Sequence, residues 1–156
     1  MNKVLSQETH VAKGIDPVSN AFAGTVTSDV MLAANCHSVT FYIYKGVGAS
    51  GTTLCTVEAC DDTSATNTSA IAFYSRLTST SDTWGALTAR TSAGFTTTAG
   101  SSQMYEITVD SDAIAASGYK YVRLKMVEQT ANSVVGAVWG VLNNLRYPRA
   151  VTATQI

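Results

Sequence analysis

The chain has 156 residues, enough for one ordinary domain whose hydrophobic core needs neither a metal ion nor a disulfide. Only 13% of the residues are charged and the formal net charge is −1. The composition therefore excludes a strongly positive surface potential that would attract nucleic acid. A nearly neutral, hydroxyl-rich surface favours association. We interpret it as a surface that other protein covers in the working state; a soluble monomer solvated by its hydroxyl groups is the alternative.

Residues 1–25 carry no two-residue alternation, and Gly14 and Pro17 interrupt them. We expect an extended N-terminal arm that packs on its own domain or on a neighbour, with disorder as the alternative, and a domain that folds without residues 1–20. Met1–Glu8 lacks the apolar segment of a signal peptide, and no stretch approaches the roughly 20 apolar residues of a membrane span. Synthesis in a cytoplasm with reduced cysteines is therefore expected.

Short strands fill the predicted domain, residues 26–145. About eight are expected, at 29–34, 38–44, 52–60, 70–78, 103–110, 119–128 and 133–142, with short candidates at 86–91 and 95–98. Two-residue alternation predicts which side chains share a face, because successive side chains of a strand point to opposite sides. The expected inward sets are Val39, Phe41 and Ile43; Ile71, Phe73, Ser75 and Leu77; and Val122, Leu124 and Met126.

One helical turn, or two, is predicted at Ser111–Gly118, which has a capping residue in front, helix formers inside and glycine at its end. A C-terminal tail is expected over residues 146–156. Strands at this spacing without a long helix are typical of an all-β fold, an antiparallel β-sandwich or jelly-roll, rather than of alternating strand–helix units.

Catalytic and metal-binding patterns are weak. Cys36 and His37 are adjacent, and Cys55 and Cys60 lie five residues apart, unlike the close pairs of zinc sites. Neither His37 nor the other histidine, His10, accompanies a serine-nucleophile motif. We predict no enzymatic activity, no cofactor, no metal and no small-molecule substrate.

Tyrosines are the side chains expected to function on the surface. If Phe41 points inward, Tyr42 and Tyr44 point outward, and Tyr119 should oppose the inward residues of its strand. Exposed tyrosines are enriched at protein interfaces and also stack on sugars. The alternative is a second buried face, covered by a loop or by the N-terminal arm.

Residues from about Val39 to Pro148 resemble the capsid decoration (cement) proteins of tailed bacteriophages. The stretches that carry the resemblance are Ala70–Ser79 (AIAFYSRLTS), Asp82–Gly85 (DTWG) and Ala113–Met126, with Gly118–Leu124 (GYKYVRL) inside the last. These are framework residues, and they cover about two-thirds of the chain.

The resemblance implies a β-sandwich or jelly-roll subunit of the virion. Such a subunit forms a small homo-oligomer, a dimer or trimer, on the outer capsid surface, bridges major capsid protein subunits there, and has no nucleic-acid or membrane partner. By analogy, the arm and the tail would contact other subunits. With the outward tyrosines, the expected partner-contact residues are Asn2, Lys3, Val4, Leu5, Tyr42, Tyr44, Tyr119, Arg146, Tyr147 and Arg149.

Three other functions stay open. A head–tail connector or a tail-tube protein would also be a virion protein without catalytic residues. A carbohydrate-binding or adhesin-like β-sandwich belongs to a different class. In that case the outward aromatic side chains would stack on sugars, and these are Tyr42, Tyr44, Trp84 and Tyr119.

Overall fold

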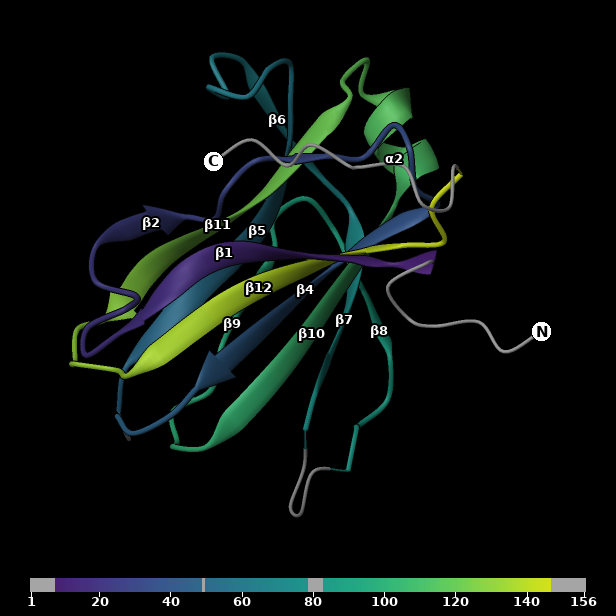
Figure 1. Cartoon of the computed structure of the whole chain (residues 1–156). Coiled ribbons are helices and arrows are strands. Elements are labelled where there is room, and N and C mark those ends of the chain that lie inside the picture. The colour runs from purple at the N-terminus through teal and green to yellow at the C-terminus, as the bar shows by residue number, and fades with distance from the viewer. Residues whose placement is uncertain (1–7, 49, 79–82, 147–156) are drawn as a thin grey trace.

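Two antiparallel six-stranded sheets pack face to face as a sandwich, with one short helix at one end (Figure 1). The computed structural model describes residues 8–48, 50–78 and 83–146. Sheet A contains, in spatial order, β1 (His10–Val18), β12 (Gly136–Asn143), β4 (Ser38–Lys45), β10 (Gln103–Asp110), β7 (Phe73–Leu77) and β8 (Thr88–Arg90). Sheet B contains β2 (Thr25–Thr27), β11 (Tyr121–Thr130), β5 (Thr52–Cys60) and β6 (Thr68–Ile71), with β3 (Met31–Leu32) paired to β11 and β9 (Phe95–Thr96) paired to β5.

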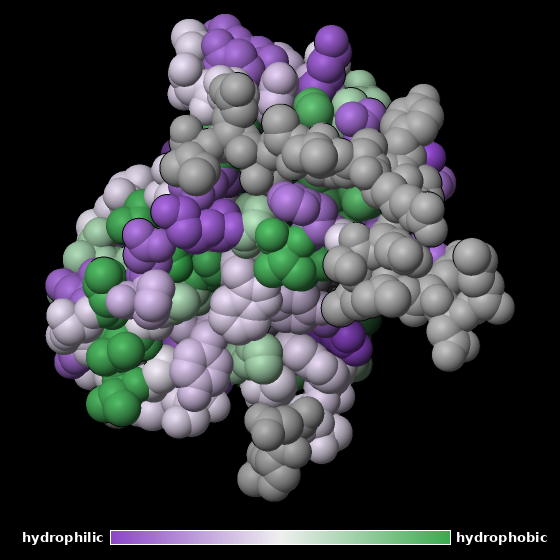
Figure 2. Space-filling view, in the orientation of Figure 1, coloured by the Kyte–Doolittle hydropathy of each residue, from purple (hydrophilic) through white to green (hydrophobic). Residues whose placement is uncertain are grey.

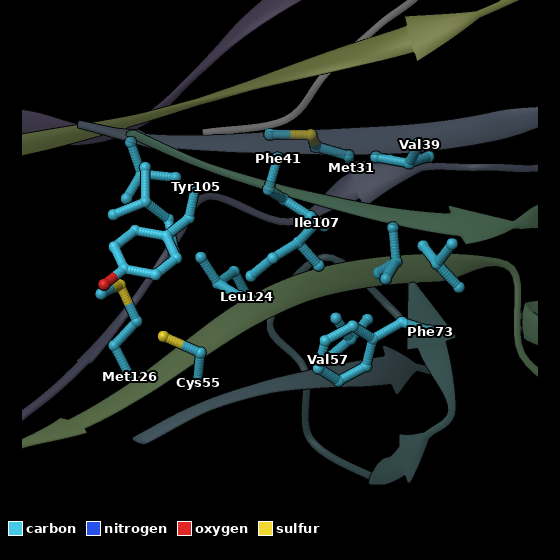
Figure 3. Packing of buried hydrophobic residues seen from close by; sticks show 14 of the residues in the cluster. Met31, Val39, Phe41, Cys55, Val57, Phe73, Tyr105, Ile107, Leu124 and Met126 are labelled. Atoms are coloured by element: carbon cyan, nitrogen blue, oxygen red, sulfur yellow. The ribbon is translucent and has the colours of Figure 1, made fainter. Parts of the chain in front are cut away.

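The predicted all-β sandwich is confirmed. Alternation directs one side of each long strand toward the core, and the expected inward residues of β4 and β11 are all completely buried. Figure 3 shows side chains from both sheets, among them Phe41, Ile107 and Leu124, meeting between the layers. No helix among the described residues is long and apolar enough to cross a membrane.

The strand predicted at 70–78 divides at Ala72, which is exposed. Its first part, β6, pairs with β5 in sheet B, and its second part, β7, pairs with β10 in sheet A. Ile71, Phe73 and Ser75 are nevertheless all buried, as the alternation predicts. The chain therefore changes sheets without turning its apolar side away from the core.

Residues 10–18, placed by the sequence in an N-terminal arm, form β1 at one edge of sheet A. This strand pairs with β12 from His10–Leu142 to Val18–Gly136. Its register shifts on both sides of Ile15, and each shift interrupts the alternation that would have revealed a strand. Of the alternatives, packing on its own domain is therefore observed, and the strands of the sandwich begin at His10 rather than at residue 26.

The predicted helical turn is α2 (Ser111–Ala116), and it is followed by Gly118 at φ 83°. Asp110 occupies the N-cap position but makes no side-chain capping hydrogen bond. Ser111, the first residue of the helix, instead donates its hydroxyl to the carbonyl oxygens of Cys36, at 2.7 Å, and Ala33, at 3.2 Å. The serine thus joins the helix to the turn before β4.

Candidate functional site

A single row of side chains crosses the outer face of sheet A. It passes through neighbouring strands at one register, in the order Lys13 (β1), Trp139 (β12), Tyr42 (β4), Glu106 (β10) and Arg76 (β7). Residues directly opposite in antiparallel strands point to the same face with Cβ atoms about 4.5–5.5 Å apart, so neighbouring side chains in the row are in contact range. Segments far apart in the sequence are thereby joined into one surface.

Three aromatic rings, which we call the aromatic cluster, occupy the middle of this face. Tyr42 stacks on Trp139 with ring centroids 5.8 Å apart, and Trp84 lies against the same Tyr42 at 6.3 Å with tilted planes. Trp84 comes from the loop between β7 and β8, and a bridge to Thr78 holds it there. The guanidinium carbon of Arg76 lies 4.7 Å above the Trp84 ring, a cation–π distance. The cluster is therefore held on several sides.

The charges beside the cluster neutralise each other. Arg76 donates two hydrogen bonds to Glu106, at 3.0 and 2.7 Å, in the bidentate geometry that arginine forms with carboxylates. This hydrogen bonding raises the pKa of Arg76. Burial raises the pKa of Tyr42, and the negative charge of Glu106 raises it further, so the phenol stays protonated. The centre of the face therefore presents the aromatic cluster and an arginine–glutamate ion pair whose two charges compensate each other.

Exposed apolar side chains extend this face on either side of the row. Val11, Tyr44 and Tyr74 are 60%, 44% and 44% exposed, and their registers place them on the same side of sheet A as Tyr42. The centre of the view in Figure 2 is made mainly of weakly polar and apolar residues. Together with the aromatic cluster, these side chains give the outer face of sheet A an apolar character, which is common on surfaces that bind another molecule.

The outer face of sheet B has a different character. Glu58 on β5 pairs with Arg123, at 2.7 Å, and with Lys125, at 3.1 Å, both on β11. Burial opposes ionisation of Glu58, but the hydrogen bonds and charges of the two cations outweigh it and lower the pKa of Glu58. This face therefore carries a charged network on β5 and β11 in place of aromatic rings, and the face of sheet A is the candidate functional surface.

Only some of the predicted contact residues come together on this surface. Tyr42 and Tyr44 lie on it, whereas Tyr119 follows α2 and packs partly buried against the core. Tyr119 therefore does not belong to the aromatic face expected from the sequence, because the strand that it was assigned to begins only at Tyr121. Arg146 is exposed beyond β12, and its backbone N–H donates to Asn35. The remaining predicted contacts, Asn2, Lys3, Val4, Leu5, Tyr147 and Arg149, lie outside the described residues.

Sequence reasoning missed Trp139. Its neighbours in the chain, Val138 and Gly140, are buried, so alternation could have placed the indole on the outer face. Its position beside Tyr42 depends on the register between β12 and β4, which no local pattern contains.

Among the described residues, no group of three or more histidine, cysteine, aspartate or glutamate side chains is arranged to hold a metal ion. Cys36, Cys55 and Cys60 are all buried and unpaired. Burial raises the pKa of all three thiols, that of Cys55 to about 12 and that of Cys60 to about 11. The reactive thiolate is therefore almost absent at neutral pH.

We expect these thiols to resist modification in the folded protein. Incubated with a thiol-specific chromogenic reagent at pH 8, the native chain should release almost no chromophore within the time that free cysteine needs to react completely. The same chain in concentrated guanidinium chloride, which serves as the control, should react at all three cysteines. A thiol that reacts in native buffer as fast as free cysteine would contradict the buried positions.

Comparisons with known proteins give weak structural likenesses. No protein-family model matches the chain, and the search of curated proteins gave no match. A chain in the structure of the infectious bursal disease virus Gx strain is 16% identical, with a TM-score of 0.26 over 90% of this chain and 42% of that one. A mutant VP2 protein of the same virus, in derived T=1 particles, is 14% identical, with a TM-score of 0.27 over 95% of this chain and 42% of that one. This chain spans less than half the length of either, and likenesses at such scores carry no argument about function.

Proposed function

We propose that the protein is a non-enzymatic virion structural protein that binds the outside of a phage capsid as a small homo-oligomer and stabilises it by bridging major capsid subunits. The observation that carries the proposal is the outer face of sheet A, where the aromatic cluster lies between exposed apolar side chains. The resemblance to decoration proteins and the low content of charged residues, 13%, also support it.

The face suits a weak contact that is repeated many times. Its side chains project from hydrogen-bonded strands and pack against one another, so little conformational freedom is lost when a partner docks. Aromatic side chains supply large contact areas at interfaces. A capsid presents many identical sites, so that an oligomer bound at several of them gains affinity through effective concentration.

The test is co-sedimentation with capsids assembled from the phage's major capsid protein without this chain. Tyr44→Glu places a charge on the exposed aromatic face, and we expect it to weaken binding about tenfold or more, as at an energetically important interface position. Thr27→Glu adds the same charge to an exposed position in β2 of sheet B and should bind as the unmodified chain does. Equal binding by Tyr44→Glu, or an equal loss in Thr27→Glu, would contradict the proposal, and light scattering would report the oligomer.

Carbohydrate binding is the second candidate, because the aromatic cluster adjoins a bidentate arginine–glutamate pair, a combination able to stack on and hydrogen-bond a sugar. The ring contacts weigh against it, since Arg76 covers one face of Trp84 and Tyr42 lies over Trp139. A sugar-binding protein would be retarded on a glycan column, and Trp84→Ala would abolish the retardation. That result would favour the second candidate over the first.

A further inference from the structure

A cavity of about 450 Å³ opens at the side of the sandwich away from β1. Its walls come from the β7–β8 hairpin and from β9 and β10, and they include Leu77, Thr88, Arg90, Phe95 and Tyr105. We call it the edge cavity, because β8 is the last strand of sheet A on this side. Its volume lies in the range of about 300–1,000 Å³ that is usual for ligand sites.

Arg90 supplies a positive charge that no carboxylate of the described residues neutralises. Its Nε donates to the hydroxyl of Ser75 at 2.9 Å, and its guanidinium carbon lies 5.0 Å above the Phe95 ring. None of the ion pairs in the described part of the chain includes Arg90. These contacts fix the orientation of the guanidinium, and among the described residues they leave the N–H groups of its two terminal nitrogens for a ligand.

The rest of the lining defines what would bind there. No aspartate or glutamate occurs among the lining residues that the structure describes. The other lining cation, Arg76, is already paired with Glu106, so Arg90 supplies the net charge of the lining residues that the structure describes. The walls beside it are the side chain of Leu77 and the rings of Phe95 and Tyr105. A guanidinium matches the planar, two-oxygen geometry of a carboxylate, and the walls suit an apolar neighbour.

We infer that the edge cavity binds an acidic side chain, with an apolar residue beside it, on an extended segment of a protein partner. A peptide fits better than a free organic acid because, among the strands that the structure describes, β8 pairs only with β7. An unpaired strand edge can take up another extended chain through backbone hydrogen bonds. The inference goes beyond the proposed function, since it requires a protein segment but not a capsid.

Nuclear magnetic resonance titration of the ¹⁵N-labelled full chain tests this without any capsid. The probe is an acetylated and amidated peptide with the sequence Gly-Leu-Glu-Leu-Gly, and its matched control carries Gln in place of Glu. We expect saturable amide shifts in residues 88–90 and 95–98, and at least about tenfold weaker binding of the Gln peptide, as for loss of a charge-assisted hydrogen bond. Absence of saturable shifts, or equal affinity for both peptides, would overturn the inference.

Three variants assign the binding to Arg90. Arg90→Gln should weaken binding of the Glu peptide about tenfold or more. Thr88→Glu, at an exposed lining position, should weaken peptide binding to a similar extent, because it places a carboxylate beside the arginine. This variant replaces Arg90→Gln as the test if Arg90→Gln does not fold. Lys120→Gln removes a positive charge from an exposed residue that does not line the cavity and should leave affinity unchanged.

Two results in the variants or with another ligand would also count against the inference. Unchanged affinity in both cavity variants would place the peptide elsewhere. Saturable binding of glucuronate, with none of glucose and none of the peptide, would show that the cavity takes a free acidic sugar instead.

Discussion

Deleting residues 1–20 is expected to abolish cooperative thermal unfolding of the chain. The deletion removes β1, which pairs with β12 along one edge of that strand from His10–Leu142 to Val18–Gly136. Ala12 and Gly14 are buried in that strand, and Ile15 packs against the core. Gly14 lies so close to β12 that an added Cβ would be 2.7 Å from the carbonyl oxygen of Val138. Without β1, β12 would become a bare edge and the core would open to water at that side.

The magnitude follows from what the strand contributes. Ala12 and the partly buried Ile15 each contribute less than the roughly 1.5–3 kcal/mol of a fully buried large apolar side chain, so most of the contribution of β1 is its backbone pairing with β12. A domain of this kind is stable by only about 5–15 kcal/mol. The deletion also removes the carbonyl oxygen of Gly14 that accepts the Asp29 N–H, and that of Ser19 that accepts the Ser133 hydroxyl. Loss of the strand, its backbone pairing and these hydrogen bonds should therefore remove most of the free energy of unfolding.

The matched control is a deletion of residues 1–7, which keeps all of β1 and the hydrogen bond from Leu145 N–H to the Glu8 carbonyl oxygen. Both truncated chains are to be followed by circular dichroism on heating, with calorimetry as the check on cooperativity. The shorter deletion should retain a sharp transition. A sharp transition in the longer deletion, within a few degrees of the full chain, would restore the interpretation from sequence that the domain folds without these residues.

The strands that the sequence predicted well carry their large apolar side chains mainly on one face. Gln103–Asp110 and Thr52–Cys60 have the predicted bounds, and the predicted inward side chains of β4 are fully buried. In such strands the alternation of apolar and polar residues is itself the consequence of burial, so it can be followed without knowledge of the partner strands.

Features that depend on the relation between strands could not be predicted in the same way. The bulges on both sides of Ile15 hide β1, because each shifts the residues that follow to a new register. The switch of sheets at Ala72 leaves the alternation intact and so has no local signal. The aromatic cluster likewise depends on the register between β12 and β4 and on the position of the loop that carries Trp84, although Tyr42 alone was recognisable as outward-facing.

Gly94→Ala is expected to destabilise the fold by about 2–5 kcal/mol, the sum of left-handed backbone strain and overpacking. Gly94 adopts φ 78°, which an L side chain rarely accepts. Its added Cβ would overlap the carbonyl oxygen of Cys55 and come within 2.8 Å of the Thr56 side chain. The turn before β9 would have to move away from β5, and Phe95, which pairs with Cys55, would move with it.

A matched glycine separates the two contributions to this loss. Gly118 has a similar φ of 83°, but an added Cβ there would meet nothing within 4 Å. Gly118→Ala should therefore cost only the strain, about 1–2 kcal/mol, in urea unfolding with an unchanged slope. Gly94→Ala should exceed it clearly and should also weaken peptide binding in the edge cavity, because Phe95 forms part of the wall under Arg90. Equal losses of unfolding free energy in the two variants would mean that the close approach of this turn to β5 contributes nothing to the destabilisation by Gly94→Ala.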